Sequence, residues 1–337
     1  MFNAVVVDSN YGSVSKTNLD YISKMMLKNN IHVRLEHYLS EDELISGCKD
    51  ADAILATGNP PITSKVLHSL PRLKMVQRFG IGVNSIDLEA ASETNTLIMF
   101  MPNFCVDELA THAMSLILGL LRNAAYYDRN IRKGKWPKAS YFLPSDMSSM
   151  VIGLFGFGGS ARPLYKMLHD GFGSKVISCD PFVTDDVKKD FDVEFVSFDD
   201  LLKRSDIISL HAPLNDKTKH IFNSNAFGKM KESAMIINIA RGGLIDEKAL
   251  ISALQNKEIR FAGLDVFEQE PISPENPLLK MENVMLTCHS AFYGEKSQKT
   301  QIELAISLTN DVLNNKSVSE KYIANRSVIA RDLVKIL

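Results

Sequence analysis

The sequence predicts an α/β protein with two doubly wound parallel sheets, each covered by helices. Two series of short apolar segments alternate with helical patterns, one before about residue 100 and one after residue 150. The length of 337 residues exceeds what one hydrophobic core usually supports, so two domains are expected. Hydrophobic residues make up 45% of the chain and charged residues 23%, which is typical of a globular protein.

Five strands are expected in the first series, because β-branched and apolar residues gather in short runs. These runs are AVVVD, IHVRLEHY, ADAILAT, LKMVQRF and LIMFM. Helices are expected between them, at 14–29, 41–47, 63–70 and 86–93. Ser40 and Thr63 are the expected N-caps, since a hydroxyl can accept from the first helical N–H groups.

The segment between the two series predicts a long helix and then a connector. The run VDELATHAMSLILGLLR, residues 106–122, is strongly apolar and begins with acidic residues, which suit the positive end of a helix. The following stretch, GKWPKASYFLPSDMSS, is rich in polar, Gly and Pro residues and is interpreted as a connector over residues 134–149.

Six strands are expected in the second series: MVIGLF, KVISC, DIISLH, AMIINI, FAGLDV and NVMLTC. Their continuous apolar character indicates strands covered on both faces. Six such strands with intervening helices match the Rossmann-type dinucleotide-binding fold. A last helix near 296–314 is expected to return to the first domain. The predicted domains are therefore 1–101 with 293–337, which is discontinuous and flavodoxin-like, and 102–292, which binds the dinucleotide.

A glycine-rich turn joins the strand VIGLF to the helix ARPLYKML. Gly156 permits the tight turn, Gly158 lets the backbone approach a pyrophosphate, and Ala161 is small enough for helix–strand packing. Pro163 is compatible with the first helical turn, whose N–H groups have no internal partner. Those N–H groups are the expected ligands of an anionic pyrophosphate.

Asp180 follows the second strand of this series, 22 residues after Gly158. A carboxylate at this place is expected to accept from the adenosine ribose 2′-hydroxyl and to repel a 2′-phosphate, so NAD is favoured over NADP. A glycine turn alone is also compatible with a plain loop. The strand, the helix and Asp180 together favour the cofactor site.

Three ionisable residues follow strands of the second series: Arg241 after AMIINI, Glu270 after FAGLDV and His289 after NVMLTC. Parallel strands end at one edge of a sheet, so these side chains are expected near the cofactor. Singly, they could be a solvated turn cation, an exposed acid and a structural histidine. Together they suit the reduction of a 2-oxo acid, in which Arg binds the carboxylate, His donates the proton and Glu favours the protonated imidazole.

The chain resembles the NAD-dependent D-isomer-specific 2-hydroxyacid dehydrogenase family. The segments that carry the resemblance are FGIGVNSIDLEAA, CVDELATHA, GLFGFGGSA, SLHAPLNDKT, MIINIARGGLIDEKAL, GLDVFEQEP and LTCHSAFYGE. The resemblance implies that Arg241, Glu270 and His289 are catalytic. It also implies further cofactor contacts at Gly159, Ser160, Ala212, Pro213, Ala240 and, at the nicotinamide carboxamide, Asp265.

For the substrate, the resemblance implies that backbone N–H groups near Gly80, Ile81 and Gly82 bind the carboxylate. It further implies a homodimer built through the cofactor domains. CVDELATHA and HSAFYGE are most similar to the branch of C-terminal binding proteins and their bacterial dehydrogenase relatives. That branch usually has Trp where this chain has Phe292.

Departures from the family pattern leave alternatives open. Cys288 stands where the family commonly has Pro, so the loop that carries His289 is expected to be less constrained. The segment ATGNPP contains Thr57 and Gly58 in place of the Arg-Ser pair of phosphoglycerate dehydrogenases, which weakens a phosphoglycerate-oxidising function. An NADH-sensing binding protein with vestigial turnover is the other alternative. His112 and His211 are interpreted as structural.

Several classes of function are disfavoured by composition. The net charge is −2 with scattered Lys and Arg, so no nucleic-acid partner is expected. The start MFNAVVVDSN does not resemble a secretory signal, and the most apolar stretch, 114–121, is too short to cross a bilayer. Four separated cysteines without a C-x-x-C pair give no support for a metal and fit a cytoplasmic protein.

Overall fold

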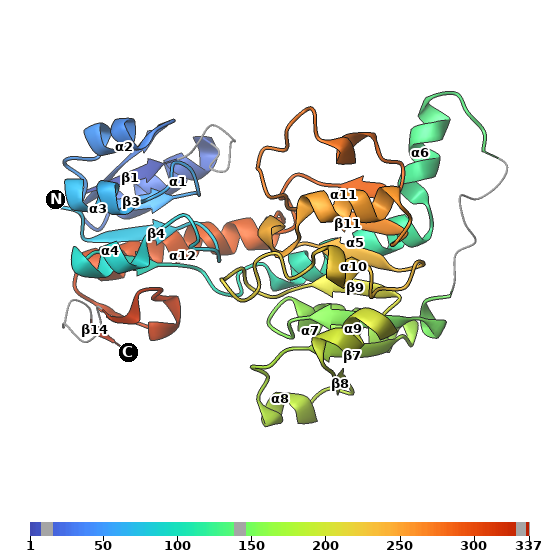
Figure 1. Ribbon diagram of the computed structural model, residues 1–337. Helices are drawn as coiled ribbons and strands as arrows, with labels where there is room; N and C mark the ends of the chain where they lie inside the picture. Colours follow the sequence, from blue (N-terminus) through green and yellow to red (C-terminus); the bar gives the residue numbers. More distant parts are fainter. Residues whose placement is uncertain (8–15, 138–145, 328–334, 337) are drawn as a thin grey trace. The chain divides into compact units, whose positions relative to one another are not determined.

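The computed structural model describes residues 1–7, 16–137, 146–327 and 335–336. The chain divides into two compact units, unit 1 with Met1–Phe104 and Glu295–Leu337, and unit 2 with Cys105–Gly294 (Figure 1). Both boundaries lie within three residues of the predicted ones. The end of the first predicted strand at Asp8, residues 14–15 of the first predicted helix and residues 138–145 of the connector lie outside the described residues.

Unit 1 contains a five-stranded parallel sheet with the order β2-β1-β3-β4-β5. Its strands, all of them expected, are β1 (Phe2–Val7), β2 (Ile31–Glu36), β3 (Ala53–Ala56), β4 (Met75–Arg78) and β5 (Leu97–Met99). Its helices are α1 (Lys16–Leu27), α2 (Glu41–Gly47), α3 (Ser64–Ser69), α4 (Leu88–Glu93), α12 (Glu295–Leu313) and the short η5 (Glu320–Tyr322). Two further short strands, β13 (Ser317–Val318) and β14 (Lys335–Ile336), pair in parallel.

The unit 1 sheet is buried on both faces. Successive residues of β1 point to opposite sides of the sheet, and each side packs into its own core. Ala4 and Val6 belong to a core that includes residues of α1 and α12. Val5 and Val7 belong to the other core, which includes residues of α2, α3 and α4. The last long helix therefore completes unit 1, although it follows unit 2 in the chain.

The two predicted N-caps of unit 1 behave differently. The Ser40 hydroxyl accepts from the Glu43 N–H at 3.3 Å, which satisfies one free donor of α2. Thr63 stands at the N-cap of α3, but its hydroxyl makes no capping bond. Its buried Oγ1 has no hydrogen-bond partner among the described residues. The position of Thr63 was predicted correctly, and its capping bond was not.

Unit 2 contains a seven-stranded parallel sheet with the order β12-β11-β10-β9-β6-β7-β8. Its strands are β6 (Val151–Phe155), β7 (Lys175–Cys179), β8 (Glu194–Phe195), β9 (Ile207–Leu210), β10 (Met235–Asn238), β11 (Phe261–Leu264) and β12 (Val284–Leu286). The prediction of six strands was wrong by one, since β8 was missed. This edge strand has only two residues, too few to form an apolar run.

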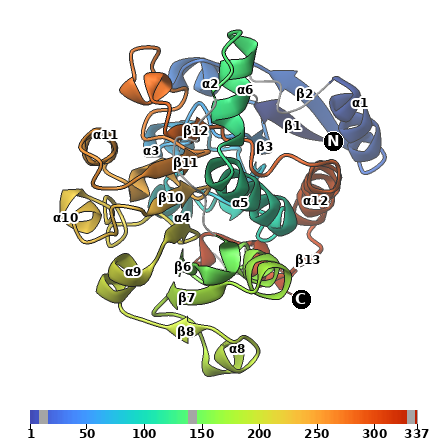
Figure 2. The same cartoon turned by 90° about the vertical axis from the view of Figure 1, so that its right-hand side faces the viewer.

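Helices cover both faces of the unit 2 sheet (Figure 2). The helices of unit 2 are α5 (Val106–Leu121), α6 (Ala124–Arg132), α7 (Ala161–Lys166), α8 (Asp185–Lys189), α9 (Phe198–Arg204), α10 (Ser224–Phe227) and α11 (Glu247–Gln255), with the short η1 (Met147–Ser149), η2 (Met167–Gly171), η3 (Gly242–Leu244) and η4 (Pro277–Lys280). One core packs under α9, α10 and α11, and the other under α5 and α7. Within the described residues, no helix has the length and apolar character needed to cross a membrane.

Candidate active site

The carboxyl ends of the unit 2 strands all meet at one edge of the sheet because every strand pair is parallel. The strand order reverses at β6, whose neighbours β7 and β9 continue the chain in opposite directions across the sheet. In doubly wound sheets, ligands bind outside the carboxyl ends at such a reversal. The predicted site residues of unit 2 all lie in segments that follow these strands.

The glycine-rich turn follows β6 and leads into α7. Gly156 has a φ of +91°, and a Cβ at this position would lie 2.8 Å from the Ala212 nitrogen, so only glycine fits. A Cβ on Gly158 would meet nothing within 4 Å, which leaves this backbone open to a ligand. Ser160 is the N-cap of α7, and Pro163 is its third residue, as the tolerance of proline in a first turn requires.

Asp180, directly after β7, closes one side of this turn. Its Oδ2 accepts from the Phe157 N–H at 2.7 Å and its Oδ1 accepts from the Phe182 N–H at 2.8 Å. Each carboxylate oxygen can accept more than one hydrogen bond, so these contacts orient Asp180 without using up its acceptors. The carboxylate is thus fixed beside the turn, and its predicted contact with the ribose stays a prediction.

The segment after β9 packs against the other side of the turn. His211 Nδ1 lies 3.0 Å from the Ser160 hydroxyl, and its Nε2 lies 2.9 Å from the Ser209 hydroxyl. Although part of the residue reaches the surface, desolvation of its ring lowers the pKa of His211 to about 3. Two residues further on, the Pro213 carbonyl accepts from the Thr218 hydroxyl at 2.7 Å, which stabilises this segment.

His289 and Glu270 are in direct contact. His289 Nδ1 lies 2.6 Å from Glu270 Oε2, and Glu270 Oε1 accepts from the Phe267 N–H at 2.9 Å. Glu270 is therefore held from its own loop and presents one oxygen to the imidazole. The Phe292 ring lies edge-on to the His289 ring, with 6.4 Å between the ring centroids. Neither side chain of the His–Glu pair is buried, so a ligand can reach the imidazole.

Arg241 follows β10 in a loop that Asn238 holds on both sides. The buried Asn238 side chain donates to the Arg241 carbonyl at 2.9 Å and accepts from the Ala240 N–H at 3.1 Å. Arg241 Nη1 donates to the Ala240 carbonyl at 2.6 Å. Burial lowers the pKa of Arg241, and the nearby Glu270 acts in the opposite direction. A Cβ on Gly242 would overlap the Phe267 carbonyl, so this glycine lets the Arg241 and Glu270 loops approach each other.

Asp265 anchors the loop that carries His289. The fully buried carboxylate accepts from the Thr287 hydroxyl at 2.6 Å and from the Ser290 and Ala291 N–H groups at 2.9 Å. The Asp265 carbonyl accepts from the His289 N–H at 2.7 Å. His289 has a φ of +52°, which is uncommon for a residue with a side chain, and these bonds hold it there. Oδ2 accepts from the Ala291 N–H alone, and the predicted contact of Asp265 with the nicotinamide carboxamide stays a prediction.

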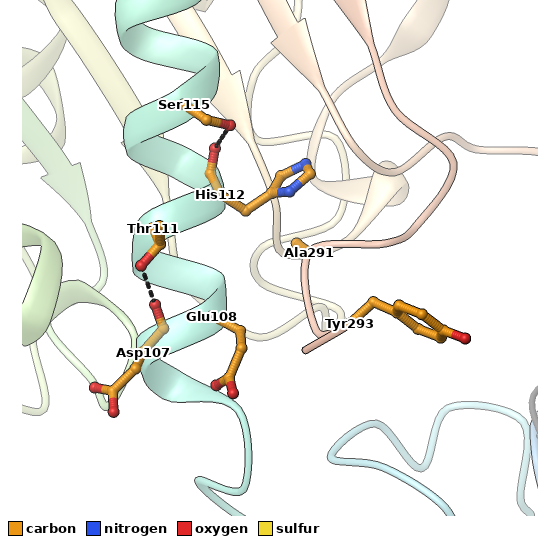
Figure 3. A pocket seen from close by; sticks show the side chains of 7 residues that line it. All are labelled: Asp107, Glu108, Thr111, His112, Ser115, Ala291 and Tyr293. Carbon is orange, nitrogen blue, oxygen red and sulfur yellow. Dashed lines mark hydrogen bonds between the residues drawn. The ribbon is translucent and has the colours of Figure 1, made fainter. Parts of the chain in front are cut away.

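A cavity of about 360 Å³ lies beside the first half of α5 and the end of the His289 loop. Figure 3 shows its lining residues: Asp107, Glu108, Thr111, His112, Ser115, Ala291 and Tyr293. His112 Nε2 lies 2.9 Å from the Thr287 hydroxyl and 3.4 Å from Asp265 Oδ1. The structural interpretation of His112 agrees with these contacts, since its imidazole belongs to the network around Asp265.

Gly80, Ile81 and Gly82 belong to unit 1, in the loop after β4. Gly80 has a φ of +145°, and its carbonyl accepts from the Met101 N–H at 3.0 Å. Arg78, at the end of β4, donates to the Phe79 carbonyl at 2.7 Å and to the Gly82 carbonyl at 3.0 Å. The predicted role of the N–H groups in this loop stays a prediction.

Sequence reasoning missed three positioning residues: Arg78, Asn238 and Asp265 in its anchoring role. Their partners are mostly backbone groups, which leave no pattern of residue types in the sequence. The position of Asn238 at the end of an apolar strand is the one available signal, since a buried amide there must be hydrogen-bonded.

Comparisons with known proteins identify the family of the chain. Residues 114–291 match the family model described as "D-isomer specific 2-hydroxyacid dehydrogenase, NAD binding domain". A D-3-phosphoglycerate dehydrogenase of Methanocaldococcus jannaschii is 37% identical over 262 residues, which cover 77% of this chain and 49% of that protein. A hydroxypyruvate reductase of Thermotoga maritima is 35% identical over 283 residues, which cover 83% of this chain and 90% of that protein.

A similar solved structure is that of D-lactate dehydrogenase from Aquifex aeolicus complexed with NAD and lactic acid. The TM-score is 0.81 at 26% identity, over 93% of this chain and 96% of that chain. The chain spans about half the length of its phosphoglycerate dehydrogenase relatives. By family model and by identity, the chain belongs to the D-isomer-specific 2-hydroxyacid dehydrogenase family, and unit 2 contains the NAD-binding domain of that family.

Proposed function

We propose that this chain is an NADH-dependent D-2-hydroxyacid dehydrogenase that reduces a 2-oxo acid to the D-2-hydroxy acid. The observation that carries the proposal is the 2.6 Å contact between His289 Nδ1 and Glu270 Oε2 at the sheet edge that also holds Arg241 and the glycine-rich turn. A cation for a carboxylate and an acid–base pair for a carbonyl oxygen are thereby combined with a dinucleotide site.

The residues of unit 2 fit the cofactor. The open backbone at Gly158 and the N–H groups of the first turn of α7 suit a pyrophosphate. Asp180 suits the ribose 2′-hydroxyl and disfavours a 2′-phosphate. Bound NADH supplies the hydride that reduces the carbonyl carbon of the substrate.

His289 is the proposed proton donor. Its Nδ1 is tied to Glu270, so Nε2 is the nitrogen that protonates the substrate oxygen during reduction and takes the proton back during oxidation. Glu270 fixes the ring orientation and stabilises the imidazolium form by charge. The Asp265 network keeps the His289 backbone in place while the proton moves.

Arg241 is the proposed partner of the substrate carboxylate, because a guanidinium offers two parallel N–H donors to it. Backbone N–H groups at Gly80, Ile81 and Gly82 are proposed to contribute to the same recognition. Phe292 is proposed to contact the substrate side chain, since its ring lies beside that of His289.

A panel of 2-oxo acids, followed through NADH absorbance, tests the proposal. Rapid consumption with at least one short or branched 2-oxo acid is expected. Tight NADH binding without consumption of any member would favour the alternative of an NADH-sensing protein with vestigial turnover.

Phosphoglycerate oxidation is the other alternative, which the names of several relatives favour. Against it, the Thr57 hydroxyl donates to the Val7 carbonyl at 3.3 Å and is thus used within unit 1. Rapid oxidation of 3-phosphoglycerate would nevertheless establish this activity.

A homodimer and a cytoplasmic location complete the proposal. The family resemblance supports the dimer, and Cys48, Cys105, Cys179 and Cys288, all unpaired, suit a reducing compartment. Light scattering after gel filtration tests the dimer, for which twice the mass of 37.6 kDa is expected.

A further inference from the structure

The ring of His211 connects the glycine-rich turn to the interior of the sheet. Its Nδ1 lies 3.0 Å from the hydroxyl of Ser160, the N-cap of α7, and its Nε2 lies 2.9 Å from the hydroxyl of Ser209 in β9. Ser209 is fully buried, so a ligand at the turn cannot touch it. Ser160 is only partly buried and makes no capping bond to α7, which leaves its hydroxyl committed to the imidazole.

Two neutral tautomers of His211 satisfy these contacts, and they have opposite consequences for Ser160. With the proton on Nε2, the ring donates to Ser209 and its Nδ1 must accept the Ser160 proton. Ser160 would then present only lone pairs to a phosphate, which is repulsive. With the proton on Nδ1, the ring donates to Ser160 and accepts from Ser209, so the Ser160 O–H is left to donate elsewhere.

We infer that His211 is a positioning residue for the cofactor: its Nδ1–H donates to Ser160, so that the Ser160 hydroxyl donates to a phosphate oxygen of the bound dinucleotide. The chain of donors runs from the Ser209 hydroxyl to His211 Nε2, from His211 Nδ1 to Ser160, and from Ser160 to the anion. The inference rests on the proposed function, because it requires a dinucleotide at this turn.

Two further observations support this role. The turn packs closely against the His211 segment, since a Cβ on Gly156 would lie 3.0 Å from the His211 carbonyl carbon. The low pKa of His211, about 3, keeps the ring neutral, so its two nitrogens must differ, one a donor and the other an acceptor. A rigid, neutral ring can therefore orient the Ser160 hydroxyl without adding a charge.

A double-mutant cycle on the dissociation constant of NADH, measured by fluorescence titration, tests the chain of donors. Ser160→Ala removes a donor to an anion and should weaken binding about 10- to 100-fold. His211→Ala should weaken it about 3- to 30-fold, and the double variant should bind no more weakly than Ser160→Ala alone. His211→Asn, whose amide N–H can replace Nδ1–H, should recover most of the affinity.

The control is His169→Ala, which removes a surface histidine paired with Asp170 and should leave NADH binding unchanged. Effects of Ser160→Ala and His211→Ala that simply add would overturn the relay, as would a Ser160→Ala variant of unchanged affinity. Turnover is not measured, so an active site that fails to reduce any 2-oxo acid leaves this result intact. A wild-type protein that binds no NADH would overturn the relay and the cofactor site together.

The tautomer of His211 provides a second test. If His211 had only a structural role, NADH would not change which ring nitrogen carries the proton. Nitrogen NMR of histidine-labelled protein, with His211 assigned by the His211→Asn variant, reports which ring nitrogen carries the proton. Saturation with NADH should leave a single Nδ1–H form, and adenosine, which lacks phosphates, should not impose it. An Nε2–H form in the NADH complex would overturn the inference.

Discussion

Each unit places an arginine at the carboxyl end of a parallel strand, and the two are used differently. In unit 1, Arg78 donates to the carbonyls of Ala56, Phe79 and Gly82 at 3.2, 2.7 and 3.0 Å. In unit 2, Arg241 donates to the carbonyl of its neighbour Ala240. Within the described part of the chain, its other N–H groups have no acceptor. Arg78 therefore fixes a loop, whereas Arg241 retains donors for a ligand.

The difference shows that the same sheet architecture can either hold a loop in place or present ionisable side chains to a ligand. The carboxyl edge of unit 1 is organised so that backbone groups of a glycine-containing loop are held in place. The carboxyl edge of unit 2 combines ionisable side chains that come from different strands. Substitutions of His289 or Arg241 should therefore reduce turnover and leave folding intact, whereas substitutions of Arg78 should lower the stability of the fold.

The largest expected effect is on turnover when the proton donor is removed. His289→Ala should lower kcat about 10²- to 10⁴-fold, because general acid catalysis is lost, while the dissociation constant of NADH changes less than about twofold. The measurement is steady-state consumption of NADH with the best 2-oxo acid of the panel, together with fluorescence titration of NADH.

The chain offers a closely matched control at His220. Like His289 it has a positive φ, 51° against 52°, and it pairs with a carboxylate, Glu268, at 2.7 Å. If catalysis requires the His–Glu pair at the proposed site, His220→Ala should keep kcat within about twofold of the wild type, because its His–Glu pair lies elsewhere. Equal losses in the two variants would contradict the assignment of His289.

The next largest expected effect is on kcat/KM, and it distinguishes Arg241 from Arg78. Arg241→Lys keeps the charge but loses the planar pair of donors, so kcat/KM should fall about 10- to 100-fold. The same variant should unfold at a temperature close to that of the wild type, since among the described residues the guanidinium makes one hydrogen bond, to a main-chain carbonyl. An unchanged kcat/KM would show that another group binds the carboxylate.

The reverse pattern is expected for Arg78. Arg78→Ala leaves three carbonyls without their charged donor and should lower the free energy of unfolding by about 2–4 kcal/mol. Thermal unfolding followed by circular dichroism measures this loss, and Arg241→Ala is the control that should show little of it. A stable Arg78→Ala variant would remove the contrast between the two edges.

How far the sequence predicts the molecule depends on the kind of contact. The sheet edge of unit 2 was predictable because parallel strands end together, so Arg241, Glu270 and His289 could be placed there from strand order alone. The same rule places His289 and Glu270 near each other, and the structure adds their 2.6 Å contact. The strands of both sheets were likewise predictable from apolar runs, except for β8 with its two residues.

Contacts made to the backbone were not predictable in the same way. Arg78 reaches the Ala56 carbonyl, 22 residues earlier in the chain, and no residue type marks that acceptor. Asp265 accepts from Thr287, Ser290 and Ala291 of a loop whose path depends on the fold, and this anchoring role had no signal in the sequence. Thr63 shows the same limit, because N-cap position does not fix the rotamer of its hydroxyl.

The smallest expected effect concerns His211, which lies at the edge of unit 2 but, like Arg78, has its polar atoms satisfied by the chain. Its pKa is lowered from 6.5 to about 3 in the folded state, so only the unfolded ring takes up a proton between these values. Stability due to the neutral ring is therefore complete above pH 6.5 and is lost as the pH falls toward 3.

Between pH 7 and 5, the wild type should lose about 1–2 kcal/mol more of its unfolding free energy than His211→Asn does. Urea denaturation of both proteins at the two pH values measures the difference, and parallel losses would mean that His211 is not held neutral. A steeper loss in the wild type would place His211 with Arg78, as a side chain at a ligand-binding edge that acts by fixing the groups around it.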